Sequence, residues 1–216
     1  MSLAELDLSP QPRGLGKRGE PVWDLALLYP VQGEWSEEEY LALESNSENR
    51  LIELVNGFIE VLPMPEPLHQ GISRLLFRKL DDFTTERRKG EVFYAPLPVR
   101  LWQNQMREPD ILFVKPQRIK HRRRPPEGAD LAIEIVSPGA ENRERDLQTK
   151  RREYAKAKIP EYWIVDPETE QITVLVLNGK AYKIHGVFQR GDQATSKLLP
   201  GFSVDVAAVF DAGAGR

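Results

Sequence analysis

The chain has 216 residues, the length of one ordinary to large domain that can bury a substantial core. Charged residues make up 29% of it, but acids and bases nearly cancel to a net charge of −3. Proteins that coat nucleic acid are usually basic overall, so the bulk charge does not support that role, although it allows an enzyme that contacts DNA through one local patch. The absence of cysteine excludes disulfides, thiolate zinc sites and cysteine nucleophiles.

Few residue types remain that could hold a metal ion. The three histidines, His69, His121 and His185, show no paired spacing. A metal would therefore be held mainly by carboxylate oxygens, which suits Mg²⁺, with Mn²⁺ as a substitute. No apolar run approaches the ~20 residues that span a bilayer, and no signal segment opens the sequence. We expect a soluble cytoplasmic protein without membrane contact.

The first elements follow a proline- and glycine-rich start. Residues 1–30 lack a sustained period and are interpreted as an irregular N-terminal arm, ahead of a single domain over residues 31–212. A helix is expected to begin at Ser36, because Glu39 three residues later completes a capping box.

Two apolar runs within residues 51–62 flank Asn56-Gly57, the strongest short-range signal of a β-hairpin. A two-residue turn there places Glu53 opposite Glu60 on one face, where two carboxylates repel each other. Either this edge is exposed and solvent screens the charges, or a cation lies nearby. The sequence alone favours the exposed edge.

An amphipathic helix is predicted over residues 69–89, ended by Gly90. Its expected stripe consists of Ile72, Leu75, Leu76, Lys79, Leu80 and Phe83. Strands are predicted over residues 98–102 and 110–114. The following basic run, Arg118 to Arg124, is interpreted as a solvated loop and is also the best local candidate for phosphate contact.

The second half of the chain alternates strands and helices. It contains strands over residues 129–136 and 161–165, with a helix over 142–158 between them. A hairpin pairs residues 172–177 with 181–185 across Asn178-Gly179, and a short helix is expected near residues 206–210. This order predicts one α/β domain around a mixed sheet.

Three ionisable residues interrupt the apolar pattern. Glu134 lies in a run apolar enough to be buried on both faces, where a carboxylate is costly unless it is paired or binds a metal. Asp110 opens a strand, a position that aspartate often occupies for structural reasons alone. Lys150 shares the core-directed stripe of the next helix with Leu147 and Tyr154. It could extend its amine to solvent or pair with an acid four residues earlier.

Together, these residues could form a metal-dependent catalytic site. Converging carboxylates can hold a divalent cation and leave positions open for water. Such a cation polarises a phosphoryl oxygen and activates a bound water for attack on a phosphodiester. A neighbouring lysine can orient that water and offset the charge of the transition state.

Five segments resemble the PD-(D/E)XK nuclease superfamily and, within it, the Uma-two restriction-endonuclease-like family, long classed as a domain of unknown function. The resemblance covers about residues 35 to 210. Its segments are Glu-Leu-Val-Asn-Gly at 53–57, His-Gln at 69–70, Arg-Glu-Pro-Asp-Ile at 107–111, Glu-Ile-Val-Ser-Pro at 134–138, and 145–167, which begins Arg-Asp-Leu-Gln-Thr-Lys.

The resemblance implies a restriction-endonuclease-like core, a mixed central sheet flanked by helices, with an N-terminal helix and hairpin and a C-terminal hairpin. It implies that Asp110 and Glu134 are the two acids of the motif and that the main-chain carbonyl of Ile135 also ligates the metal. Glu53 would add a carboxylate from the early hairpin. The motif lysine normally stands at the position of Val136, whereas this family supplies it from the following helix, which Lys150 matches.

The function that follows is Mg²⁺-dependent hydrolysis of DNA, with Asp110, Glu134, Lys150 and Glu53 as catalytic residues. One alternative is a nuclease-fold module that binds DNA or a partner protein without catalysis. Another is a purely structural ion pair between Glu134 and Lys150, which requires Asp110 and Glu53 to point elsewhere. His69 matches a family position without a clear role. A homodimer would suit cleavage of both strands, and the arm could serve it.

Overall fold

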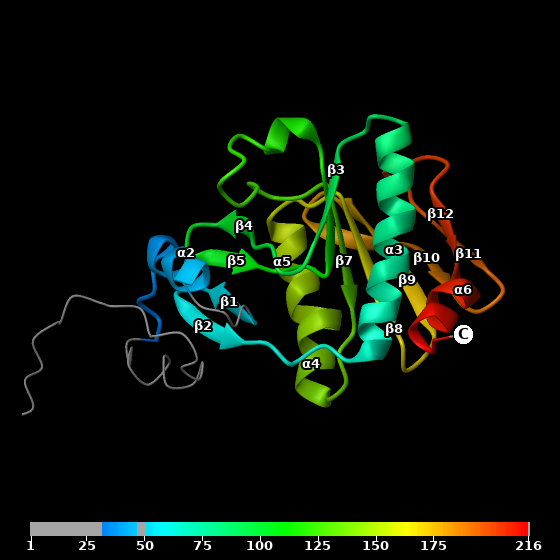
Figure 1. Cartoon of the computed structure of the whole chain (residues 1–216), viewed down its shortest axis with the longest axis horizontal. Coiled ribbons are helices and arrows are strands. Elements are labelled where there is room, and N and C mark those ends of the chain that lie inside the picture. The colour runs from blue at the N-terminus through cyan, green and yellow to red at the C-terminus, as the bar shows by residue number, and fades with distance from the viewer. Residues whose placement is uncertain (1–31, 47–50, 216) are drawn as a thin grey trace, which may run out of the picture.

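The computed structural model describes residues 32–46 and 51–215, so the arm expected over residues 1–30 lies outside the described residues. The central feature is a six-stranded sheet with the order β10-β9-β8-β7-β6-β3 (Figure 1). Its strands are β3 (Glu91–Tyr94), β6 (Ile111–Val114), β7 (Leu131–Ile135), β8 (Glu161–Asp166), β9 (Gln171–Asn178) and β10 (Ala181–Phe188). Only β7 and β8 run parallel, so the sheet is mixed, as predicted.

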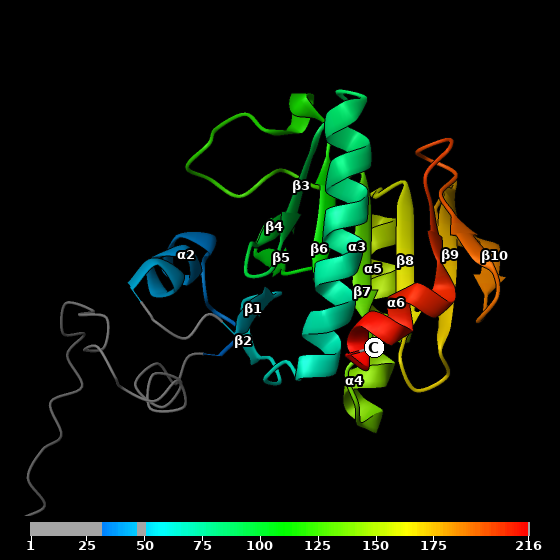
Figure 2. The same cartoon turned by 45° about the vertical axis from the view of Figure 1, so that its right-hand side comes forward.

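Helices cover both faces of this sheet (Figures 1 and 2). Helices α3 (Pro67–Glu86) and α6 (Val206–Gly213) pack together on one face. The other face carries a continuous helical segment made of α4 (Ala140–Glu144), a π-helical turn η2 (Arg145–Thr149) and α5 (Lys150–Lys156). A sheet with helices on both faces confirms the predicted fold class.

The sequence did not predict the second sheet. It has four strands in the order β2-β1-β5-β4. These strands are β1 (Ile52–Val55), β2 (Phe58–Val61), β4 (Val99–Trp102) and β5 (Gln105–Arg107). Together with helix α2 (Glu37–Asn46), the sheet encloses a small core that includes Tyr40, Leu54 and Met106. The expected strand over 98–102 therefore belongs here, and not to the central sheet.

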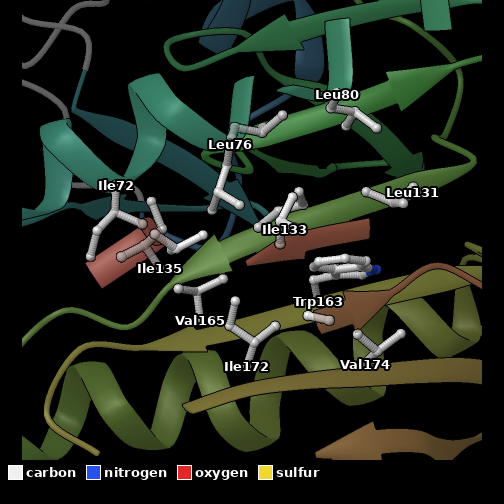
Figure 3. Packing of buried hydrophobic residues seen from close by; sticks show 14 of the residues in the cluster. Ile72, Leu76, Leu80, Leu131, Ile133, Ile135, Trp163, Val165, Ile172 and Val174 are labelled. Carbon is white, nitrogen blue, oxygen red and sulfur yellow. The ribbon is translucent and has the colours of Figure 1, made fainter. Parts of the chain in front are cut away.

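The main core lies between the central sheet and α3 (Figure 3). Ile72, Leu76 and Leu80 of α3 pack against Ile133 and Ile135 of β7, and their burial confirms the predicted apolar stripe at these positions. Lys79 was wrongly placed in that stripe, because it is exposed on the outer side of the helix.

The turn was predicted correctly in one of the two hairpins and incorrectly in the other. At the first, Asn56 and Gly57 both have positive φ, and Glu53 pairs with Glu60, which confirms the predicted register. At the second, Asn178 pairs with Ala181, so the turn is Gly179-Lys180 and not the predicted Asn178-Gly179. Gly179, with a φ of 66°, takes the first turn position, a conformation that glycine adopts without steric cost.

The remaining short elements complete the chain. They are a 3₁₀ turn η1 (Pro116–Arg118) before the basic loop, and the two-stranded pair β11 (Gln193–Thr195) and β12 (Ser203–Asp205). The expected capping box forms, because Ser36 and Glu39 exchange backbone and side-chain hydrogen bonds. Within the described ranges, no helix is long and apolar enough to cross a membrane.

Candidate active site

The site is built on the face of β7 that turns toward α5. Along this strand, Ile133 and Ile135 enter the core beneath α3, while Glu134 points the other way, since neighbouring residues of a strand face opposite sides. Only 3% of Glu134 is exposed. Its Oε2 accepts a hydrogen bond of 2.9 Å from Lys150 Nζ, and its Oε1 accepts one from the Tyr154 hydroxyl.

Lys150 stands at the centre of a ring of acids. Besides Glu134, its Nζ lies 3.5 Å from Glu53 Oε1 and 3.7 Å from Asp146 Oδ1. Its side chain is only 3% exposed, so it does not extend its amine to solvent. Burial alone would lower the pKa of Lys150, but the three carboxylates raise it above its ordinary value. Lys150 is therefore a permanent cation at this place.

Lys150 contacts Glu134 from helix α5, and not from the strand that carries Glu134. Val136, which occupies the usual lysine position, is buried in the apolar core, and its N–H bonds the carbonyl of Val165. Lys150 instead projects from the start of α5 onto the carboxylate of Glu134. The helix-face prediction for Lys150 and the buried-strand prediction for Glu134 thus converge on one contact.

Asp110 lies next to this pair, at the start of β6. Its Oδ2 accepts a 2.7 Å hydrogen bond from the N–H of Ile135, directly after Glu134. Its Oδ1 lies 3.2 Å from Nε2 of His69, in the first turns of α3. Burial alone would lower the pKa of His69, but the hydrogen bond and charge of Asp110 raise it. His69 thus holds one oxygen of Asp110, a role that the sequence did not reveal.

Asp110, Glu134, Ile135 and Lys150 all line one cavity of about 400 Å³. The same cavity is bordered by further polar residues, which are His69, Glu108, Arg145 and Asp146. The structural alternative required both Asp110 and Glu53 to point away from the Glu134–Lys150 pair. Because Asp110 shares their cavity, that alternative does not describe this site.

Glu53 occupies a different position from the other three. It does not border the cavity. Its Oε1 accepts a 2.7 Å bond from the Glu108 N–H, and its Oε2 accepts one of 2.7 Å from Arg107 Nη1. Both oxygens are therefore already engaged, and Glu53 reaches the site only through Lys150. Burial alone would raise the pKa of Glu53, but Lys150 and Arg107 lower it to about 2.

The solvent-exposed interpretation of the Glu53–Glu60 pair is wrong, because Glu53 is fully buried. The cation that separates the two carboxylates is Arg107, whose Nη1 lies 2.7 Å from an oxygen of each. Its Nε and Nη2 bond to Glu153 of α5 at 2.7 and 3.0 Å. Arg107, only 1% exposed, thus ties the four-stranded sheet to helix α5. The repelling cross-strand pair was the one sequence signal of such a cation.

Several other acids surround the carboxyl group of Glu134. Burial is the largest cause that raises the pKa of this carboxyl, and Asp110, Asp146 and Glu53 raise it further against the opposing effect of Lys150. The result is a pKa of about 8, well above the ordinary value of a carboxyl group. A carboxyl group surrounded by other acids is a place where an added cation would be bound favourably.

The donor set fits a magnesium ion. Over residues 32–46 and 51–215, no three or more His, Asp or Glu side chains converge into a preformed cage. Mg²⁺ does not need one, because it keeps several waters and is usually held by one or two carboxylates together with substrate phosphates. Asp110, Glu134 and the carbonyl of Ile135 supply oxygen donors of this kind at one cavity wall.

The sheet topology, the two acids and the lysine together define a restriction-endonuclease-like protein. The sequence profile of the Uma2 family, described as "Putative restriction endonuclease", matches residues 37–207, and the chain belongs to this family. The fold is similar to the crystal structure of a putative nuclease from Anabaena variabilis, from a family of unknown function. That similarity has a TM-score of 0.66 at 18% identity and covers 82% of this chain and 98% of the other. No curated protein sequence matches the chain.

Proposed function

We propose that the chain is a Mg²⁺-dependent endonuclease that hydrolyses phosphodiester bonds of DNA. The observation that carries the proposal is the sharing of one cavity by Asp110, Glu134 and Lys150, with the lysine amine 2.9 Å from the glutamate. Two acids and a lysine around an accessible cavity are the groups that metal-assisted phosphodiester hydrolysis requires.

Each residue has a distinct part in this proposal. Asp110, Glu134 and the carbonyl of Ile135 would hold the metal ion, which when bound lowers the pKa of a water and polarises a phosphoryl oxygen. Lys150 donates N–H groups toward the attacking water and offsets the charge that develops on the phosphate. Because its pKa is raised, Lys150 acts as a donor and a charge, and not as a general base.

Glu53 and His69 act by holding other residues of the site in position. Glu53, which does not border the cavity, positions Lys150 at 3.5 Å instead of ligating the metal directly. His69 orients Asp110 through its 3.2 Å contact. Groups that hold a reacting side chain in place contribute to rate because small displacements at the reacting atoms are costly.

The basic loop supplies the proposed DNA contact. Arg118, Lys120 and Arg122 each pair with a neighbouring acid, and the loop is largely exposed. Residues 120–124 line a second cavity of about 990 Å³, which shares Pro96 with the catalytic cavity. A DNA backbone lying across Pro96 would therefore touch both, and binding would weaken as salt concentration rises.

The test is cleavage of supercoiled plasmid DNA with Mg²⁺ or Mn²⁺. Asp110→Asn and Lys150→Met should each reduce the rate by roughly 100-fold or more, the usual cost of removing an electrostatic group from a transition state. Lys156→Met is the matched control, because Lys156 is an exposed lysine of the same helix that stacks on Trp102. Metal-dependent cutting that survives both Asp110→Asn and Lys150→Met would overturn the assignment.

A second candidate function is a nuclease-fold module that binds DNA or a protein without cutting. Both oxygens of Glu134 are engaged by Lys150 and Tyr154, an arrangement that is complete without a metal. Calorimetric titration with Mn²⁺ separates the two candidates. Binding that disappears in Asp110→Asn supports the nuclease, whereas a wild-type protein that takes up no Mn²⁺ supports the binding module.

A further inference from the structure

The helix that carries Lys150 contains a π-helical turn over Arg145–Thr149. The N–H of Lys150 bonds to the carbonyl of Arg145, five residues earlier. In a regular α-helix, residues five apart differ by about 140° around the axis, because each residue turns the chain by about 100°. The wider turn instead brings positions 145 and 150 toward the same side. π turns inside α-helices occur frequently at functional sites.

Arg145 consequently borders the same cavity as Lys150, Asp110 and Glu134. Its side chain is 18% exposed, whereas that of Lys150 is 3% exposed, so the guanidinium lies nearer the opening. It also borders a neighbouring cavity of about 660 Å³, beside the hairpin of β1 and β2. The arginine therefore stands on the wall between two solvent-accessible spaces.

The hydrogen bonds of Arg145 leave part of its guanidinium available. Its Nε donates to Asp146 Oδ1 at 3.1 Å, and its Nη1 donates to Asn142 Oδ1 at 3.1 Å. In the part of the chain that the structure describes, no hydrogen bond involves Nη2. Asp146 and Asn142 thus hold the planar group from one side and leave donors for a ligand on the other.

Lys150 and Arg145 are the lysine and arginine that border the catalytic cavity. Lys150 is surrounded by three carboxylates, which compensate most of its charge within the protein. Arg145 has one such partner, Asp146. A phosphodiester entering a cavity lined by several acids needs a cation with donors still available, and the guanidinium fork matches phosphate oxygens.

We propose that Arg145 binds a non-bridging oxygen of the phosphodiester in the catalytic cavity, and that the π turn is what places it there. The proposal rests on the proposed function and extends it by one substrate-binding residue. A purely structural role for Arg145, as the partner of buried Asp146, would make its loss a matter of stability alone.

The test measures equilibrium binding of a fluorescein-labelled DNA duplex of mixed sequence by anisotropy, over a series of KCl concentrations with Ca²⁺ in place of Mg²⁺. The slope of log affinity against log salt counts phosphate contacts at about 0.9 per contact on B-DNA. Arg145→Gln should lower the magnitude of this slope by about 1, while Arg145→Lys should keep it, since the charge remains. Arg152→Gln, an exposed arginine outside the cavity, is the matched control and should leave the slope unchanged.

The same proteins are then assayed for plasmid cleavage with Mg²⁺, and their folding is checked by thermal unfolding. We expect kcat/KM to fall roughly 10- to 100-fold in Arg145→Gln, the usual effect of losing a hydrogen bond to a charged group. In Arg145→Lys it should fall less, because the charge persists without the fork.

The outcomes separate this inference from the proposed function. Wild-type cleavage with an unchanged salt slope in a folded Arg145→Gln protein would overturn the role of Arg145 and leave the nuclease assignment intact. Binding with a lowered slope in Arg145→Gln, but without cleavage by the wild type, would overturn the nuclease and retain the phosphate contact. A wild-type protein that neither binds nor cuts DNA would overturn both.

Discussion

The two faces of strand β7 carry side chains of opposite chemistry, although these residues alternate along one strand. Toward α3, Ile133 and Ile135 join Trp163 and other apolar side chains in a core that excludes water (Figure 3). Toward α5, Glu134 is buried almost as deeply, but it is held by Lys150 and Tyr154. Apolar burial stabilises the fold in proportion to area, whereas a buried carboxylate is tolerated only with matching partners.

This difference distinguishes residues that stabilise the fold from residues that stability alone does not explain. Replacing a buried ion pair by apolar residues of similar size is often neutral or stabilising, so stability does not explain a network of Glu53, Arg107, Glu134 and Lys150. Proteins commonly break the local pattern at functional sites and compensate elsewhere. The polar face of β7 breaks the apolar pattern in this way, and the following changes compare it with the apolar face.

The largest loss of stability is expected from Arg107→Gln. This change leaves Glu53 buried without its hydrogen-bonded guanidinium and removes the link to Glu153, and breaking a buried pair costs about 3–5 kcal/mol. Urea denaturation would measure the free energy of unfolding. Arg122→Gln is the control, because Arg122 is exposed and pairs with Glu91 at the surface. Equal midpoints for Arg107→Gln and wild type would show that Arg107 does not join the two sheets energetically.

The apolar face should respond to Ile133→Ala with a loss of about 2–5 kcal/mol, through lost burial and a residual cavity. Ile133→Val, which removes one methylene, should cost about 0.5–1.5 kcal/mol. Well below the unfolding temperature, both proteins should retain most of the plasmid-cutting rate expected of the wild type. If Ile133→Val lost activity as fully as Lys150→Met, the two faces would not be functionally distinct.

The polar face also predicts a pH dependence of stability, measured without divalent metal. The pKa of Glu134 is raised to about 8 in the folded protein from an ordinary value of 4.5, so between these values the folded state binds more protons than the unfolded state. Stability must then fall as pH rises through this window, by at most about 1.4 kcal/mol per pH unit. Glu134→Gln removes this titration.

The stability of Glu134→Gln relative to wild type should therefore increase from about pH 5 to pH 8 and then level off. Glu53 contributes with the opposite sign, since its pKa is lowered to about 2 and its stabilisation is lost as pH falls from about 4.5 toward 2. Thermal unfolding of both proteins across this range measures the difference. A constant difference from pH 5 to 8 would contradict the assigned pKa of Glu134.

What the sequence determined by itself is local and periodic. It predicted the capping box at Ser36, the register of the first hairpin and the burial of Glu134, because caps, turn residues and apolar periods act over a few residues. The helical stripe also placed Lys150 toward the core. The family resemblance added Asp110, whose position at a strand start has an equally common structural explanation.

Only the tertiary structure decided how distant segments meet. The four-stranded sheet joins β1 and β5, about fifty residues apart, and Arg107 links it to Glu153 of helix α5. A π turn interrupts the segment that the sequence predicts as one regular helix, and Arg145, its first residue, borders the cavity. Periodicity reports which side of an element is buried, but not which other element covers it or which charge arrives there. Glu53 shows the consequence, because its burial depends on an arginine from another strand.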